Sequence, residues 1–319
     1  MKIAVLERNS VGTDVPVSCY EDFGEVTYFR NTVEEDAAEH VADADIVIAN
    51  KAPLNEATLK DCPNVKLICE FATGFDNVDL AYCRGRGIKV ANVKDYSTPA
   101  VAQHTIALAL YLMEHLPAYD AYVKGGAYGA QDRFSNFDLP FAELEGKTWG
   151  IIGMGNIGRK VAEIARAFGC NVIFYSVTGK STVTEYEQVS KEELLARSDV
   201  LSIHCPLSDL TRNLIDGDAL RQMKKTAVLI NVARGPVVDN DALYEALENG
   251  TIAAAGLDVL REEPIRETNP LSKIQDSNRL IITPHMAWAS TESRIRLVDE
   301  VYQNIQAFLR GEDRNIVNP

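Results

Sequence analysis

The sequence lacks any apolar stretch long enough to span a membrane, and it contains no low-complexity segment or short-period repeat. Its first residues, MKIAVLER, form an apolar run that is too short for a signal peptide, and no small-residue cleavage site follows them. We therefore expect a cytoplasmic globular protein rather than a secreted, fibrous or membrane-spanning one.

The chain is also short of positive charge. It has 32 Lys and Arg residues against 46 Asp and Glu, a net charge of −14, which would repel nucleic acids and anionic membranes. Its six cysteines are scattered without a CxxC pair, and no His-rich segment accompanies them, so the sequence predicts no metal site. Four of them lie in or beside apolar runs, which favours buried free thiols in a reducing cytoplasm.

What the sequence does contain is a nearly unbroken alternation of strand-like and helical patterns. With 319 residues, of which 46% are apolar and 24% charged, it is long enough for two domains with cores of their own. The alternation predicts an α/β protein whose parallel sheets are covered by helices on both faces. The predicted strands are Lys2–Leu6, Ile46–Ala49, Leu67–Glu70, Lys89–Ala91, Thr148–Ile152, Val172–Tyr175, Val200–His204, Ala227–Asn231, Ala254–Val259 and Leu280–Ile282.

A glycine turn near the middle of the chain predicts a dinucleotide-binding site. An apolar run leads into Gly153, Gly155 and Gly158, which have the G-x-G-x-x-G spacing, and a helical pattern and a second strand follow. Gly153 would allow the tight turn, Gly155 the approach of a pyrophosphate, and Gly158 the close packing of helix on strand. The phosphates would lie at the helix N-terminus, beside Asn156 and Ile157. The alternative is an ordinary glycine-rich turn between strand and helix.

The position of this turn implies that another domain precedes it. The first part of the chain has an α/β alternation of its own, and an apolar helix, Val101–Leu116, comes next with Pro99 in its first turn. An amphipathic helix, Thr291–Leu309, lies near the other end. The two long helices would bridge the domains, and a ligand would bind in the cleft between them. The predicted division is a discontinuous substrate-binding domain, 1–98 with 289–319, and a dinucleotide-binding domain, 99–288.

Three reactive side chains, Arg234, Glu263 and His285, follow the last three predicted strands. Ligands of doubly wound sheets bind outside the carboxyl ends of the strands, so these three groups should lie at the edge that holds the cofactor. Singly, each has an ordinary alternative: a surface ion pair, a solvated turn and a helix cap. Together, beside a dinucleotide turn, they favour a catalytic site.

These residue types suit hydride transfer between a nicotinamide and a carbonyl group beside a carboxylate. The carbonyl oxygen needs a proton as the hydride arrives, and histidine is suited to supply it near neutral pH. Glu263 would favour the imidazolium form of His285 and orient its ring. Arg234 would hold the substrate carboxylate through two N–H groups and polarise the carbonyl.

With these residues the chain resembles the D-isomer-specific 2-hydroxyacid dehydrogenases over essentially its full length. The resemblance implies a Rossmann-type cofactor domain and a smaller flavodoxin-like substrate domain, both doubly wound parallel sheets. It also implies Arg234 as substrate binder, Glu263 as partner of the acid/base and His285 as the acid/base itself. The segments that carry it are Gly-Met-Gly-Asn-Ile-Gly (153–158), Asn-Val-Ala-Arg-Gly (231–235), Gly-Leu-Asp-Val (256–259), Glu-Glu-Pro (262–264) and Thr-Pro-His (283–285).

The resemblance further implies the binding residues and the oligomeric state. Asp258 would hold the nicotinamide amide, and a homodimer would form through the cofactor domain and the arm around 117–145. Segments at Ala49-Asn-Lys51 and His285-Met-Ala-Trp288 resemble the hydroxypyruvate reductase and glycerate dehydrogenase branch. The other residues expected at the cofactor are Thr73, Asn156, Ile157, His204, Cys205, Pro206, Thr211, Val232 and Ala233. Those expected at the substrate, besides Arg234 and His285, are Lys51, Gly74, Phe75 and Trp288; for Lys51, a solvated loop lysine is the alternative.

The second strand of the predicted cofactor domain ends unlike an NAD-specific site. Such a strand normally ends in Asp or Glu, which accepts hydrogen bonds from the ribose, whereas Ser176 occupies that position here. Serine does not repel a 2′-phosphate, and Thr178, Lys180 and Ser181 follow with hydroxyls and one positive charge. We therefore expect NADP(H) to be accepted and slightly favoured over NAD; the alternative is a relaxed NAD site with Lys180 in solvent.

The predicted function is the NAD(P)-dependent reduction of a small 2-keto acid, hydroxypyruvate or glyoxylate. The alternatives are a dehydrogenase for D-lactate or 3-phosphoglycerate, and a cofactor-sensing binding protein on the same fold. The complete Arg, Glu and His set argues against the binding protein. The scarcity of cations in the first-domain loops argues against a phosphorylated substrate.

Overall fold

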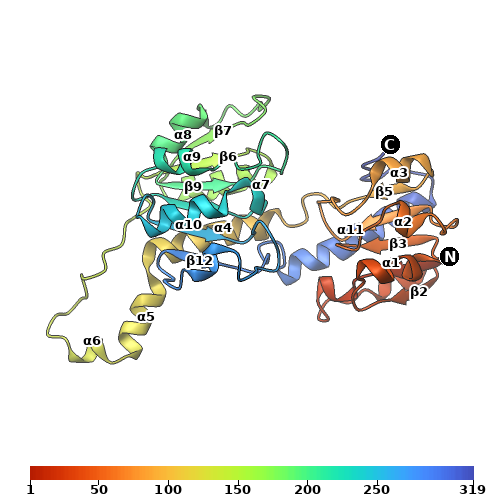
Figure 1. The fold of residues 1–319 in the computed structure, drawn as a ribbon, viewed down its shortest axis with the longest axis horizontal. Helices are drawn as coiled ribbons and strands as arrows, with labels where there is room; N and C mark the ends of the chain where they lie inside the picture. The colour runs from red at the N-terminus through yellow and green to blue at the C-terminus, as the bar shows by residue number, and fades with distance from the viewer. The chain divides into compact units, whose positions relative to one another are not determined.

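The computed structural model describes residues 1–319, and the chain divides into two compact units. Unit 1 comprises Met1–Ser97 and Ala289–Pro319, and unit 2 comprises Thr98–Trp288. Both chain termini therefore belong to unit 1 (Figure 1). No helix has the length and apolar character needed to cross a membrane.

Unit 1 is built on a five-stranded parallel sheet with the order β2-β1-β3-β4-β5. All residues of β3 and β4 are buried, as expected for central strands covered on both faces. The order reverses between β1 and β3, as in flavodoxin-like sheets. The strands are β1 (Lys2–Val5), β2 (Glu25–Tyr28), β3 (Ile46–Ala49), β4 (Leu67–Glu70) and β5 (Lys89–Ala91); the α-helices are α1 (Glu34–Val41), α2 (Glu56–Leu59), α3 (Leu80–Gly85) and α11 (Thr291–Leu309).

Unit 2 is built on a seven-stranded parallel sheet with the order β12-β11-β10-β9-β6-β7-β8. The strands are β6 (Thr148–Ile152), β7 (Asn171–Tyr175), β8 (Glu187–Gln188), β9 (Val200–Ile203), β10 (Val228–Asn231), β11 (Ala254–Leu257) and β12 (Leu280–Ile282). The α-helices are α4 (Thr98–Glu114), α5 (Leu116–Lys124), α6 (Ala127–Ala130), α7 (Asn156–Ala167), α8 (Lys191–Arg197), α9 (Gly217–Gln222) and α10 (Asn240–Glu248). These two parallel sheets confirm the predicted α/β class.

Two apolar clusters cover the two faces of the unit 2 sheet. Trp149 and Ile151 of β6 pack into one cluster with α4 and α7. Ile152, the next residue, packs into the other cluster with α8, α9 and α10. This alternation follows from the two-residue period of a strand, and it leaves the carboxyl edge of the sheet to loops.

The structure differs from the prediction at several elements. The edge strands β2 and β8 were not predicted, because their sequences, EVTY and EQ, are exposed or half-buried and form no apolar run. The helix predicted over Val101–Leu116 ends at Glu114, since His115 has a left-handed φ of 51° and a separate helix begins at Leu116. The helices α4 and α11, which were predicted to bridge the domains, belong to one unit each, α4 to unit 2 and α11 to unit 1.

Candidate active site

The glycine turn after β6 forms an open cradle at the point where the sheet order reverses between β6 and β9. Gly153 has a φ of 91°, and a Cβ there would lie 2.9 Å from the backbone nitrogen of Cys205. A Cβ at Gly158 would lie 2.2 Å from the carbonyl oxygen of Gly153. A Cβ at Gly155 would meet nothing within 4 Å, so the backbone is open to a ligand there. This geometry fits the phosphates of a dinucleotide.

The first turn of α7 offers donors to such a ligand. The helix begins at Asn156, and Gly155 precedes it as a cap with no side-chain hydrogen bond. The first N–H groups of an uncapped helix lack intrahelical partners and carry the positive end of its dipole. The two residues that follow Gly155, Asn156 and Ile157, therefore lie where anionic phosphates bind best.

The strand β7 ends at Tyr175, so Ser176 is the first residue beyond it, as expected. The Ser176 carbonyl accepts a hydrogen bond from Gly179 N–H (3.0 Å), which closes a turn. Lys180 and Thr178 are exposed on this turn. Within this loop no carboxylate occupies the position beside the end of β7.

A histidine and a glutamate from neighbouring strand ends lie in direct contact. His285 Nδ1 is 2.7 Å from Glu263 Oε2. The other oxygen of Glu263 accepts the Leu260 N–H (2.9 Å), which fixes the carboxylate. Because Nδ1 is taken by the glutamate, Nε2 is the ring nitrogen that remains for a ligand.

The backbone of His285 is strained and is held by Asp258. His285 has a φ of 56°, the left-handed region, and its N–H donates to the Asp258 carbonyl (2.9 Å). The buried Asp258 carboxylate accepts the N–H groups of Met286 (2.8 Å) and Ala287 (2.9 Å) and the hydroxyl of Thr283 (2.6 Å). Strain of this kind persists only where the surroundings determine it. Asp258 thus fixes the turn that presents the imidazole.

His104 of α4 extends this arrangement. Its Nε2 is 3.0 Å from the Thr283 hydroxyl, which itself donates to Asp258, and 3.6 Å from the Asp258 carboxylate. A helix on one face of the sheet is therefore connected to the turn that carries His285.

Arg234 follows β10, the neighbour of β11. Its Nη1 donates to the Ala233 carbonyl (2.9 Å), while Nε and Nη2 make no hydrogen bond in the chain. The next residue, Gly235, packs so closely that a Cβ would lie 1.9 Å from the Leu260 carbonyl. The turn after Arg234 therefore lies directly against the segment that leads to Glu263.

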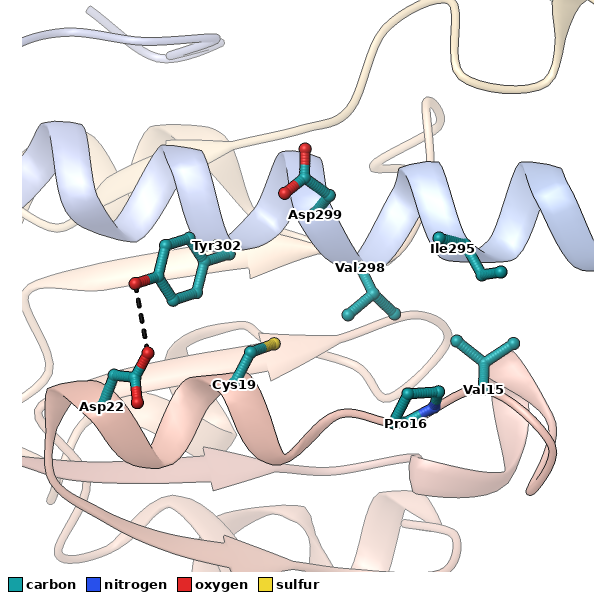
Figure 2. A pocket seen from close by; sticks show the side chains of 8 residues that line it. All are labelled: Val15, Pro16, Cys19, Asp22, Ile295, Val298, Asp299 and Tyr302. Atoms are coloured by element: carbon teal, nitrogen blue, oxygen red, sulfur yellow. Dashed lines mark hydrogen bonds between the residues drawn. The ribbon is translucent and has the colours of Figure 1, made fainter.

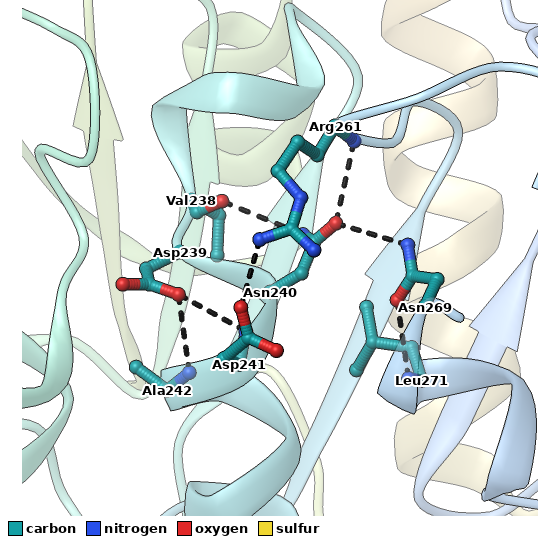
Figure 3. A network of polar contacts seen from close by, with 8 residues as sticks. All are labelled: Val238, Asp239, Asn240, Asp241, Ala242, Arg261, Asn269 and Leu271. Atoms are coloured by element: carbon teal, nitrogen blue, oxygen red, sulfur yellow. Dashed lines mark hydrogen bonds and ion pairs between the residues drawn. The ribbon is translucent and has the colours of Figure 1, made fainter.

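A buried amide pair anchors the loop that carries Glu263 (Figure 3). Asn240, the first residue of α10, accepts at Oδ1 the Asn269 side-chain N–H (3.2 Å) and the Arg261 backbone N–H (3.3 Å). Asn269 in turn caps the following short helix through Leu271 N–H (3.1 Å). The Arg261 guanidinium also pairs with the exposed Asp241 (2.7 Å). Both ends of the Glu263 loop are thereby tied to the start of α10.

The segment after β9 lies next to the glycine turn. Burial lowers the pKa of His204 to about 3, so its imidazole is neutral at physiological pH. Its Nδ1 is buried without a partner, and Nε2 lies 3.0 Å from the Ser202 hydroxyl. The Thr211 hydroxyl donates to the Pro206 carbonyl (2.8 Å) and accepts Ser208 N–H (2.7 Å). Thr211 therefore holds the loop in shape.

The expected binding residues before residue 98 belong to unit 1. Lys51 follows β3, and residues 73–75 follow β4, all at the carboxyl edge of that sheet. Lys51 donates its backbone N–H to both oxygens of Glu7 (3.0 and 2.9 Å), and its side chain is exposed. The Thr73 hydroxyl donates to the Val93 carbonyl (2.7 Å).

A separate apolar groove of about 290 Å³ lies within unit 1, between the segment 15–22 and α11 (Figure 2). It is lined by Val15, Pro16, Cys19, Asp22, Ile295, Val298, Asp299 and Tyr302. The groove contains none of the predicted site residues, and its only charged groups are two carboxylates. Such a lining would repel an anionic keto acid, so the groove is not a candidate for the substrate site.

Comparison with known protein families identifies the family to which this chain belongs. The family model for the D-isomer specific 2-hydroxyacid dehydrogenase NAD binding domain matches residues 106–287. The chain belongs to this dehydrogenase family. Its unit 2 therefore contains an NAD-binding domain, and the predicted family is confirmed.

Full-length relatives agree with this assignment. A hydroxypyruvate reductase from Blautia hydrogenotrophica is 37% identical, and the alignment covers 100% of both chains. Among solved structures, a D-lactate dehydrogenase from Aquifex aeolicus, complexed with NAD and lactic acid, is 30% identical with a TM-score of 0.86, over 100% of this chain and 99% of that one. An acyclic imino acid reductase in complex with NADPH and D-Arg is 30% identical with a TM-score of 0.88, over 99% and 100%.

Sequence reasoning about this dehydrogenase missed several residues around the site. Asn240, Asn269 and His104 carry no motif, because their roles arise from pairings between distant segments. Arg159 was also missed, although it lies in the first turn of α7. Its guanidinium donates to Asn156 Oδ1 (2.8 Å), and its charge assists backbone hydrogen bonds in lowering the pKa of Glu185.

Proposed function

We propose that this chain reduces a small 2-keto acid of the hydroxypyruvate or glyoxylate type, using a reduced nicotinamide cofactor. The observation that carries the proposal is the 2.7 Å contact between His285 and Glu263, at the sheet edge to which the ends of β10, before Arg234, and β6, before the glycine cradle, also belong. The 37% identity to a hydroxypyruvate reductase over the full length supports the substrate class.

In this proposal His285 is the proton donor. Its Nε2 gives a proton to the substrate's carbonyl oxygen, while Glu263 keeps the ring oriented and stabilises the imidazolium. Arg234 binds the substrate carboxylate through its open N–H groups and polarises the carbonyl. The dinucleotide, when bound, supplies the hydride that the C2 carbon receives.

Different residues of unit 2 would bind different parts of the dinucleotide. Gly153, Gly155 and the first turn of α7 hold the phosphates, and Ser176 with Lys180 meets the adenosine ribose. We propose that NADPH is accepted and slightly favoured, since no carboxylate faces a 2′-phosphate and Lys180 makes no ion pair. One structural relative is complexed with NADPH and another with NAD, so the fold accommodates either cofactor.

Steady-state kinetics with both cofactors test this function. Hydroxypyruvate, glyoxylate, pyruvate and 3-phosphohydroxypyruvate are compared with NADH and with NADPH, following nicotinamide oxidation. We expect the highest kcat/KM with hydroxypyruvate or glyoxylate and a modest preference for NADPH. No turnover with any keto acid, despite cofactor binding, would favour a cofactor-sensing binding protein. A strong preference for NADH would contradict the cofactor proposal.

We also propose a homodimer formed through the arm of unit 2. The helices α5 and α6 and the segment that follows project from the sheet of their own unit (Figure 1). This arm exposes large apolar side chains, among them Phe134 (92%), Phe137 and Phe141. Such a cluster on a soluble chain marks a protein interface. Sedimentation should show a dimer, and Phe134→Ser with Phe137→Ser should shift it toward monomer.

A further inference from the structure

Two carboxyl side chains lie under the loops of unit 1 that are predicted to grip the substrate. Glu7 follows β1 and Glu70 ends β4, on either side of the loop after β3 in the sheet order. The sheet order reverses between β1 and β3, and ligands of such sheets bind at the reversal. These two glutamates therefore lie beneath a ligand-binding edge.

Glu7 is well supplied with donors. Its carboxylate accepts the backbone N–H of Asn50 (2.6 Å) and, through both oxygens, that of Lys51 (2.9 and 3.0 Å). These hydrogen bonds hold the Glu7 carboxylate directly against the start of the loop after β3.

Glu70, in contrast to Glu7, has only one hydrogen-bond donor at its carboxyl group. Its side chain is 0% exposed, Oε1 accepts one hydrogen bond from Asn77 (3.2 Å), and Oε2 has no partner. An ionised carboxylate in such a place is costly, because water is excluded and one donor does not replace it. Burial raises the pKa of Glu70 to about 8; the Asn77 hydrogen bond opposes the shift, the charge of Glu7 adds to it, and Lys51 opposes it more weakly.

Few other charges face Glu70. Its strand neighbour Cys69 is a buried thiol whose pKa burial raises far above its usual range. The buried side chains of α11, the helix that packs against β4, include no titratable group. They are Ser293, Leu297, Val298, Val301, Asn304, Ile305 and Ala307. The pKa of Glu70 is therefore governed by burial, by the Asn77 hydrogen bond, and by the charges of Glu7 and Lys51.

Asn77 connects Glu70 to the loop that carries Lys51. The same Nδ2 group that donates to Glu70 also donates to the Ala52 carbonyl (3.0 Å). The Asn77 carbonyl accepts the Leu54 N–H (2.9 Å), which pairs the two loops again. A change of charge at Glu70 thus acts directly on the amide that joins residues 50–54 to residues 72–77.

Building on the proposed function, we propose that Glu70 is a positioning residue that couples substrate affinity to pH. In both of its forms it accepts the Asn77 N–H that joins the two loops expected to grip the carboxylate of the keto acid, and in its neutral form it does so without adding charge beneath them. In its ionised form it adds a second buried negative charge beside Glu7, which repels the anionic substrate and draws the Lys51 ammonium away from it. The affinity for substrate therefore falls as Glu70 loses its proton.

The pH dependence of stability, measured without substrate, tests whether Glu70 keeps its proton in the folded state. The folded pKa lies above the ordinary value of 4.5, so between 4.5 and about 8 the folded state binds one proton more than the unfolded state. This group's contribution to stability is therefore fully present at low pH, declines through that window, and is lost above about pH 8. The melting temperature of Glu70→Gln should lack this decline, whereas Glu56→Gln, an exposed charge on α2, should retain it.

Enzyme kinetics test the coupling. Across the ionisation near pH 8, the wild-type KM for the keto acid should rise about tenfold, the equivalent of one pKa unit of coupling. In Glu70→Gln, which mimics the neutral acid, KM should stay near its low-pH value while kcat keeps its wild-type pH profile. An unchanged rise of KM in Glu70→Gln would overturn the proposal, because a merely structural role would leave that rise in place.

Direct titration keeps the inference testable if the variant fails to fold. In wild-type protein with 13C-labelled glutamate carboxyls, one resonance should titrate near pH 8. A spectrum in which every glutamate titrates in the ordinary range would overturn the assignment. Absence of turnover with every keto acid would instead overturn the proposed function, while the melting and NMR measurements would still decide whether Glu70 holds a proton.

Discussion

His285 and Glu263 of unit 2 lie in direct contact, with 2.7 Å between Nδ1 and Oε2. They come from the ends of β12 and β11, which pair in parallel. The contact therefore depends on the register of two adjacent strands and on the turn that Asp258 holds. It leaves Nε2 of His285 as the nitrogen that faces a ligand.

Removing the charge of Glu263 should impair His285 without abolishing its role. We expect Glu263→Gln to lower kcat by about ten- to a hundredfold, by analogy with the effect of removing the carboxylate that orients a metal-binding histidine. His285→Ala should lower it by about 10²- to 10⁴-fold, the usual contribution of a general acid. The double variant should be no slower than His285→Ala, because both act on one proton transfer. Additive losses would show that Glu263 acts independently.

Arg234 should contribute to both binding and rate. Arg234→Ala removes hydrogen bonds to a charged group, each worth about 1.5–3 kcal/mol, so kcat/KM should fall by about a hundredfold or more. Arg234→Lys keeps the charge but loses the planar fork and should recover only part of this loss. Arg221→Ala, on the exposed surface of α9, serves as the matched control. Full activity in Arg234→Lys would argue against two-point binding of the carboxylate.

A carboxylate at position 176 should change the choice of cofactor. In Ser176→Asp, kcat/KM for NADPH should fall by about tenfold or more, because like charges in contact cost several kcal/mol. The kcat/KM for NADH should stay the same or rise, since an acidic residue at this position accepts hydrogen bonds from the ribose. Lys180→Ala should lower kcat/KM for NADPH and leave that for NADH unchanged. Equal losses for both cofactors would place Ser176 away from the 2′-phosphate.

The elements that sequence alone predicted are those with a strong local signal. The buried strands, from Lys2–Val5 to Leu280–Ile282, appear as apolar runs, and the rule about carboxyl strand ends brings His285 and Glu263 to one edge. By contrast β2 and β8, which are exposed or half-buried, have no such run. The break at His115 depends on a backbone conformation that no apolar pattern shows.

Long-range polar pairings were also beyond sequence reasoning. Asn240 and Asn269 are separated by 29 positions, and each alone is an ordinary turn residue. Glu70 follows three apolar residues of a buried strand, where its burial could be suspected, but its single partner Asn77 could not. Residues that position other residues are recognised from contacts and not from motifs.

The buried amide of Asn240 should be important for both stability and catalysis. Asn240→Leu leaves the Arg261 N–H and the Asn269 amide without an acceptor, which should lower the free energy of unfolding by about 1–3 kcal/mol. Because these donors anchor the loop that carries Glu263, kcat should fall as well, while the KM for the cofactor should change little. Denaturant unfolding and steady-state kinetics measure the two effects.

The exposed ion pair of the same loop provides the control for Asn240. Asp241→Ala removes the partner of the Arg261 guanidinium, and both side chains are at least half exposed. An exposed pair of this kind contributes about 0–1 kcal/mol, so stability and kcat should remain close to wild type. If Asp241→Ala instead lowered kcat as much as Asn240→Leu, the guanidinium ion pair and not the buried amide would be what positions Glu263.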